Sequence, residues 1–301
     1  MSRYRRSLWQ YPLFQIPLIF FGIFLAGAAL FWLLGLGRPD VAVAIALDLS
    51  SSTYAPQSFN APGTVMAQEL AAVRSYIEQN SQKLRTPNEI YVLGFGDRAI
   101  ALTSSFTSDR QKLEAELSQS LANPILSVQV GSGTDLGQAI EQGTKVLSSI
   151  QKRCRELLLV TDGEAEVPQS AVTQAATQRV KINAVVVGAD APELRQATST
   201  TRGIYLTGQQ NNLQAFFTEE FFTQFNSNRN WIIFWLGAAW ISFMWLLTLP
   251  LDKWIFQDLM KLPMNLAGQL ALGNALFWSV ATPLVVWRLG QLFGSPFFSS
   301  C

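Results

Sequence analysis

Oxygen-bearing side chains stand in three separate places of the sequence, where they could act together on one ligand. They are Asp48, Ser50, Ser52, Thr134 and Asp162. Two carboxylates and three hydroxyls supply hard oxygen donors and neither nitrogen nor sulfur, and such a set suits Mg²⁺ or Mn²⁺. Magnesium also keeps water in its coordination shell, so a position would stay open for an outside ligand. These residues therefore indicate a divalent cation site.

Each of these residues also has an ordinary explanation when it is taken alone. Ser52 and Thr134 are of the residue types that most often cap the N-terminus of a helix. Asp162 stands before Gly163, which is typical of a turn. The cation hypothesis therefore depends on a fold that brings the five residues to one place.

The neighbouring segments predict such a fold. The apolar runs 41–47, 156–160 and 182–188 are typical of strands buried on both faces, and helical patterns lie between them. This alternation predicts an α/β fold with a doubly wound, mostly parallel sheet. Asp48 and Asp162 follow two of these runs, so we expect both at the carboxyl ends of strands, where open α/β sheets bind ligands.

Residues 89–102 differ from the other runs, because two strand-like pieces flank a Gly-Asp turn. They predict a hairpin that ends in an antiparallel edge strand. The turn contains GFGDRA, residues 94–99, which fits the dinucleotide-binding pattern by letter. That fingerprint needs a helix immediately afterwards. Residues 100–107 instead have a strand-like and then a loop-like pattern, so we interpret the match as accidental.

Composition excludes several classes of function. The chain of 301 residues has no histidine, which removes the usual general base, the usual zinc ligand and the Ser-His and Cys-His nucleophile pairs. Its net charge is +1 and it has no long basic run, so the electrostatic footprint of a nucleic-acid-binding protein is missing. We expect neither an enzyme nor a nucleic-acid partner.

Long uncharged runs predict membrane-spanning helices. Residues 16–37 are long enough as a helix to cross a hydrocarbon core of about 30 Å. A secretory signal peptide cleaved near 26–28 is the alternative, but the run continues well past that point, which favours an uncleaved anchor. Residues 231–251 form a second span with tryptophans at both ends. Residues 264–287 are less apolar; we expect a third span, with a re-entrant segment or an amphipathic helix as alternatives.

The tryptophans separate these runs from a soluble middle, because all nine lie outside residues 40–225. The predicted organisation therefore has four parts. They are an N-terminal cytoplasmic tip with a transmembrane helix at 1–38, a soluble domain at 39–226, a transmembrane helix at 229–251 and a third transmembrane helix at 264–288.

Flanking cations predict the orientation. Arg3, Arg5 and Arg6 precede the first span, whereas Arg38 alone follows it closely. The positive-inside rule then puts the N-terminus in the cytoplasm and the domain outside, although long domains contribute little to that rule. The short connector 252–261 would lie on the cytoplasmic side. We expect a multi-pass protein of the plasma (inner) membrane.

The polar fragments resemble the metal-ion-dependent adhesion site (MIDAS) of von Willebrand factor type A (vWA) domains. That site is written DxSxS, a distant Thr and a distant Asp, and this chain has DLSSS at 48–52, Thr134 in SGTDL and Asp162 in TDGE. The resemblance covers about residues 40–225 and implies the vWA fold with bound Mg²⁺. It implies that the two serines and the threonine contact the cation, while the aspartates act mainly through water and hydrogen bonds. An Asp or Glu of a protein partner then completes the shell.

Two departures and one wider similarity accompany this resemblance. Ser51 stands where the family often has glycine, and the loop after it is longer than usual, so we expect a different rim and a different choice of partner. A vWA domain placed between N- and C-terminal spans is similar to the bacterial Bat (aerotolerance) membrane proteins.

The sequence thus predicts a membrane-anchored binding module that captures an acidic residue of a protein partner through Mg²⁺, in the assembly of an envelope complex. Two alternatives stay open. In a metal-dependent hydrolase, Asp48 or Asp162 would activate water. In a scaffold or transport subunit, Asn265, Gln269 and Asn274 lie on roughly one side of a helix and would line a path or a helix interface.

Overall fold

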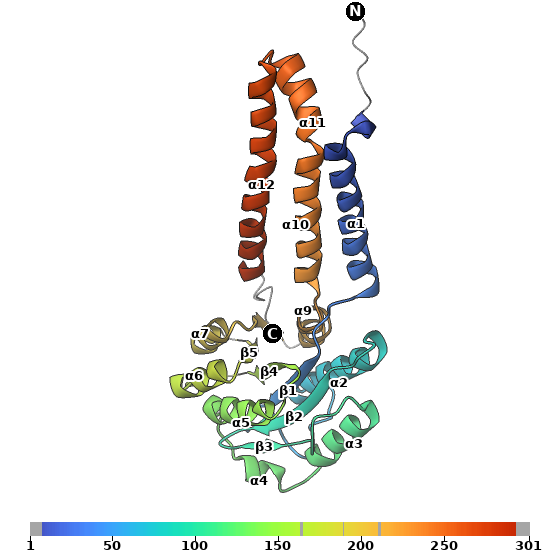
Figure 1. The fold of residues 1–301 in the computed structure, drawn as a ribbon. Helices are drawn as coiled ribbons and strands as arrows, with labels where there is room; N and C mark the ends of the chain where they lie inside the picture. The colour runs from blue at the N-terminus through green and yellow to red at the C-terminus, as the bar shows by residue number, and fades with distance from the viewer. Residues whose placement is uncertain (1–7, 163–164, 189, 210–211, 293–301) are drawn as a thin grey trace, which may run out of the picture. The chain divides into compact units, whose positions relative to one another are not determined.

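The protein is described by a computed structural model that covers residues 8–162, 165–188, 190–209 and 212–292 (Figure 1). The chain forms two compact units. One unit is Pro39–Ser227, and the other joins the segment that ends at Arg38 to the segment that begins at Asn228.

The Pro39–Ser227 unit is built on a six-stranded sheet in the order β3-β2-β1-β4-β5-β6. Neighbouring strands run parallel except at the β2–β3 edge, where they run antiparallel. Helices pack on both faces, so the predicted α/β fold with a doubly wound, mostly parallel sheet is confirmed. The strands are β1 (Val41–Asp48), β2 (Glu89–Phe95), β3 (Ala99–Ala101), β4 (Cys154–Thr161), β5 (Val180–Val187) and β6 (Tyr205–Gly208).

Strand β1 lies at the centre of the sheet and is buried along its whole length. Its side chains alternate between the two faces, as the pleat requires. Val43, Ile45 and Leu47 belong to one apolar cluster. Ala44 and Ala46 belong to the cluster on the other face, where small side chains let the covering helices come close to the sheet.

Residues 89–102 form the predicted hairpin. Gly94 of β2 pairs with Ile100 of β3 in an antiparallel register, and β3 is an edge strand. A strand therefore follows GFGDRA where a dinucleotide site needs a helix, and the pattern match is accidental.

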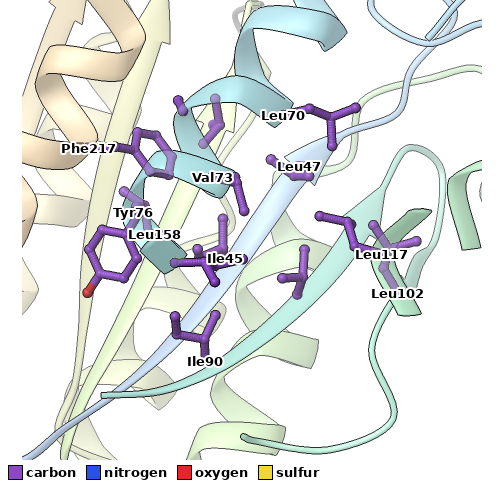
Figure 2. Close-up of a cluster of buried hydrophobic side chains, with 14 of the residues drawn as sticks. Ile45, Leu47, Leu70, Val73, Tyr76, Ile90, Leu102, Leu117, Leu158 and Phe217 are labelled. Atoms are coloured by element: carbon purple, nitrogen blue, oxygen red, sulfur yellow. The ribbon is translucent and has the colours of Figure 1, made fainter. Parts of the chain in front are cut away.

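Two helical layers cover the sheet. Figure 2 shows the first layer from inside: Leu70 and Val73 of α2 lie over Ile45 and Leu47 of β1, with Phe217 beside them. The first layer contains α2 (Val65–Lys83), α3 (Arg110–Leu121), α4 (Leu126–Val130), α8 (Leu213–Ala215), a π-helix (Phe216–Phe221) and α9 (Phe222–Phe225). The second layer contains α5 (Leu136–Ser148), α6 (Gln169–Thr177) and α7 (Pro192–Thr201).

The other unit is helical. Three of its helices are long and apolar enough to cross a membrane: Pro12–Leu34, Arg229–Leu259 and Met264–Leu289. Its elements are a 3-10 turn (Leu8–Gln10), α1 (Pro12–Leu34), α10 (Arg229–Leu246), α11 (Thr248–Pro250), a π-helix (Leu251–Leu259) and α12 (Met264–Leu292).

The segment 252–261 differs from the short connector that the sequence suggested. Helical structure continues through Pro250 into the π-helix Leu251–Leu259. Proline lacks a backbone N–H and disturbs the regular hydrogen-bond ladder, which is a common reason for a π-type turn at such a point. The second helix is therefore longer than its apolar run.

Candidate functional site

Asp48 ends β1 and is completely buried. Its Oδ1 accepts a hydrogen bond of 2.9 Å from the backbone N–H of Ser50, and its Oδ2 accepts one of 2.7 Å from the hydroxyl of Thr161. Burial raises the pKa of Asp48 above its ordinary value, and the hydrogen bonds from Ser50 and Thr161 oppose that effect. The carboxylate thus fixes the loop after β1 to the end of β4.

The loop after β1 brings two serine hydroxyls toward Asp162. Ser50 Oγ is buried and lies 3.0 Å from Ser52 Oγ. Ser52 Oγ is exposed and donates a hydrogen bond of 3.3 Å to Asp162 Oδ1. Thr53 closes the turn, since its hydroxyl donates to the Asp48 carbonyl at 2.8 Å. A row of oxygen atoms therefore leads from the protein interior to the surface.

The parallel register of β1 and β4 explains why these residues meet. Leu47 pairs with Val160, so the chain leaves both strands at the same edge of the sheet. Asp162 follows β4 there and is half-buried. Residues more than one hundred positions apart become neighbours through strand pairing alone.

Thr134 lies in the adjoining loop, which is tied to both neighbours. The Ser132 carbonyl accepts a 3.2 Å hydrogen bond from the Ser51 backbone N–H, and the Asp135 N–H donates to the Gly96 carbonyl at 2.7 Å. Thr134 itself is half-buried between these two anchor points. The structure therefore places its loop beside the serine loop.

Sequence reasoning missed Asp97, which supports the loop of Thr134. Its Oδ2 accepts a 3.0 Å hydrogen bond from the Ser132 N–H. A Cβ atom on Gly131 would lie 2.2 Å from Asp97 Oδ2, and one on Gly133 would lie 2.2 Å from Oδ1. Gly131 also has a φ of +86°, which favours glycine. The spacing Gly-Ser-Gly was the available signal for a carboxylate held between two glycines.

The ordinary explanations for Ser52 and Thr134 do not hold. The N-cap of α2 is Thr64, whose side chain accepts from the Ala67 N–H. The N-cap of α5 is Asp135, whose side chain accepts from the Gln138 N–H at 2.9 Å. The hydroxyls of Ser52 and Thr134 are thus free of the capping role.

The donor set fits a hard cation held mainly by hydroxyls. Within the part of the chain that the structure describes, no group of three His, Cys, Asp or Glu residues is arranged to hold a metal ion. A cation at this edge would therefore depend on Ser50, Ser52 and Thr134 beside Asp162, while both oxygens of Asp48 already accept hydrogen bonds. Mg²⁺ and Mn²⁺ accept such oxygen ligands together with water.

The fold and the polar edge define a class of protein. Residues 43–164 match the von Willebrand factor type A domain family. This part of the chain is a vWA domain, as its sequence motifs predicted. No curated protein matches the sequence.

Solved structures with this fold include bacterial proteins, one of them described as a membrane protein. A vWA protein from Catenulispora acidiphila has 18% identity, a TM-score of 0.47 and coverage of 60% of this chain but 42% of its own. An aerotolerance-related membrane protein from Bacteroides fragilis has 18% identity, a TM-score of 0.46 and coverage of 60% and 98%. The protein BatB from Bacteroides thetaiotaomicron has 20% identity, a TM-score of 0.44 and coverage of 60% and 96%. At these identities the likeness concerns the fold alone.

Proposed function

We propose that the vWA domain binds a divalent cation, Mg²⁺ or Mn²⁺, and through it an Asp or Glu of a protein partner. The proposed site consists of Asp48, Ser50, Ser52, Thr134 and Asp162. One observation carries the proposal: Ser50 Oγ lies 3.0 Å from Ser52 Oγ, which donates to Asp162 Oδ1 at 3.3 Å. These hydroxyls converge at the carboxyl edge of a parallel sheet, where ligands bind in such folds.

The chemistry of the donors supports capture of an acid. Ser50, Ser52 and Thr134 would contact the cation as neutral ligands, so the cation keeps residual positive charge toward solvent. A carboxylate from outside can neutralise that charge. Asp48 holds the serine loop in place, and Asp162 adds its negative charge beside Ser52.

A binding role accounts for the geometry better than hydrolysis does. A hydrolytic base needs a carboxylate oxygen that can accept a proton from water. Both oxygens of Asp48 accept hydrogen bonds from Ser50 and Thr161 inside the protein, which argues against Asp48 as this base. Asp162 Oδ1 accepts from Ser52, in keeping with a role beside the proposed hydroxyl ligands. We therefore propose an interaction module rather than an enzyme.

We also propose that the helical unit anchors the protein in the plasma (inner) membrane as a multi-pass protein, with the vWA domain outside. The long apolar helices support anchoring. Contacts between α1 and α10 support an uncleaved anchor over a cleaved signal peptide. Trp235 of α10 packs against Phe24 and Phe31 of α1, with ring centroids 6.0 and 5.7 Å apart. The proposed orientation depends on the cations Arg3, Arg5 and Arg6, which lie outside the described residues. Assembly of an envelope complex is the role proposed for such a module.

The polar residues of α12 favour helix packing over a transport path. Asn274 Nδ2 lies 4.0 Å from the sulfur of Met244 on α10. Asn265 Oδ1 accepts from the Leu266 N–H at the start of α12. Gln269 is exposed. We therefore place the main function in the vWA domain.

Calorimetric titration of Mg²⁺ and Mn²⁺ into the full chain in detergent tests the site. We expect a Ser50→Ala, Ser52→Ala double variant to lose binding, because two of the three hydroxyl ligands are removed. Ser58→Ala is the matched control: it removes a serine hydroxyl from the same loop after β1, at an exposed position that is not one of the proposed ligands. Equal binding by wild type and double variant would contradict the proposal.

A further inference from the structure

Glu69 of α2 is a buried carboxylate that the proposed function has not used. Its side chain is 0% exposed. Neither carboxylate oxygen has a hydrogen-bond partner among the described residues. Leaving a charged group in such surroundings is costly, so a helix facing an apolar core would normally carry an apolar residue there.

The position of Glu69 connects it to the proposed cation site. Its helical neighbours Met66 and Leu70 belong to the apolar cluster that also contains Leu47, and Figure 2 shows Leu70 close to Leu47. Asp48 is the next residue after Leu47 along β1. Glu69 is therefore a buried residue of α2 directly before Leu70, which lies close to Leu47 near the end of β1.

The negative charges of the proposed site affect the ionisation of Glu69. Burial raises the pKa of Glu69 well above its ordinary value, and the negative charges of Asp48 and Asp162 raise it further. The negative charges of Asp48 and Asp162 thus act on the buried Glu69 carboxyl, and a positive ion at the site would offset this repulsion.

A second buried glutamate shows how this protein treats such a group elsewhere. Glu156 of β4 is 4% exposed, but its Oε2 accepts a 2.9 Å hydrogen bond from Asn183. Lys181 Nζ lies 3.4 Å from its Oε1. The chain supplies Glu156 with a counter-charge and a donor, and the described residues supply Glu69 with neither a hydrogen-bond donor nor an ion pair.

We propose that Glu69 is a further residue of the cation site, a positioning residue whose carboxylate balances the charge of the bound cation from the α2 side. This inference rests on the proposed function. Neither of its oxygens contacts a hydroxyl of the proposed ligands within hydrogen-bond distance, so Glu69 acts through its charge and not as a direct ligand. Such outer residues hold the ligands in place and strengthen metal binding.

Titration of Mn²⁺ into the full chain in detergent tests this role. We expect Glu69→Gln and Glu69→Met to weaken Mn²⁺ binding about tenfold or more, the range typical of residues behind the direct ligands. Glu156→Gln is the control, because it removes a buried carboxylate that has its own partners, and Mn²⁺ affinity should stay unchanged. Thermal unfolding gives a second readout: Mg²⁺ should raise the unfolding temperature of wild type more than that of either Glu69 variant.

The Met variant separates cation binding from stability. It places an apolar side chain in an apolar core, so the metal-free protein should unfold at a higher temperature than wild type while binding Mn²⁺ more weakly. Wild-type affinity in both folded Glu69 variants would overturn the inference and leave the proposed cation site standing. Loss of the fold in both variants would also overturn it, because the carboxylate would then serve the fold itself. Absence of Mn²⁺ binding by wild type would remove the proposed function and this inference together.

Discussion

Asp97 shows how one side chain can set the shape of a neighbouring loop. It occupies the space beside Gly131 and Gly133 that a Cβ atom would need, and it accepts the backbone N–H of Ser132 at 3.0 Å. The glycines are required because the carboxylate lies against them. Thr134 comes immediately afterwards. Asp97 therefore holds the loop of this proposed cation ligand in place without being a cation ligand itself.

Asp97→Ala should therefore weaken cation binding while changing stability little. Asp97 is exposed, so loss of its hydrogen bond should cost about 1 kcal/mol of unfolding free energy. Mn²⁺ affinity should fall severalfold, because the loop of Thr134 is no longer held. Asp97→Asn keeps one acceptor oxygen and should restore part of the affinity. Calorimetry and chemical denaturation measure both effects.

A double-mutant cycle with Gly131→Ala separates contact from backbone strain. Gly131→Ala alone should cost about 1 to 3 kcal/mol, because a backbone with φ +86° and ψ −179° is essentially restricted to glycine, and more from the collision with Asp97. Asp97→Ala removes the Oδ2 and Cγ atoms that would lie 2.2 and 2.7 Å from the added Cβ atom, but it keeps Asp97 Cβ, which would also lie at 2.7 Å. The double variant should therefore recover part of the collision cost and be more stable than the sum of the single changes implies. Strict additivity would show that Asp97 and Gly131 do not interact in solution.

Strands that appear in the sequence as continuous apolar runs could be predicted from it. The runs 41–47, 156–160 and 182–188 became β1, β4 and β5, because strands buried on both faces must be apolar throughout. Strand β6 (Tyr205–Gly208) is partly exposed and has no such run, so the sequence gives no comparable signal for it.

Residues whose role depends on tertiary contacts could not be predicted. The motif residues after β1 and β4 were recognisable because their spacing carries a pattern. Asp97 and Glu69 have no pattern of their own. Asp97 accepts a hydrogen bond from a loop 35 positions away, and Glu69 is buried where the charges of Asp48 and Asp162 act on it. Sequence reasoning indicated the candidate ligands and missed the residues around them.

The packing of α1 against α10 depends on a small residue. A Cβ atom on Gly27 would lie 3.1 Å from the ring of Trp235, whereas nothing lies within 4 Å of one on Gly22. Small residues let membrane helices approach closely, and this close contact is a main source of their association.

Gly27→Leu should therefore destabilise the helical unit, whereas Gly22→Leu should not. Both changes add the same side chain to the same helix, so membrane insertion and helix propensity change equally. We expect a lower unfolding temperature in detergent for Gly27→Leu only. Unfolding is measured by the fluorescence of Trp235 and the other tryptophans. Equal effects of the two variants would mean that α1 does not pack on α10 through Gly27.

The orientation of the whole molecule decides where a partner can be found. Three helices among the described residues are long and apolar enough to span a membrane. In the proposed multi-pass arrangement, the domain enclosed by the first and second spans would lie on the side of the bilayer opposite the N-terminus. The cations before the first span favour a cytoplasmic N-terminus, and hence a domain outside.

Protease added to spheroplasts, which are cells without their cell wall, tests this orientation. The loop between β1 and α2 contains exposed residues such as Ala55 and Gln57, so cleavage there in intact spheroplasts should split the chain into two membrane-bound pieces, a short one with the first span and a long one with the other two. The same loop should be protected in inverted membrane vesicles. The reverse pattern would place the vWA domain in the cytoplasm, and the acidic partner would then have to be a cytoplasmic protein rather than one of the envelope.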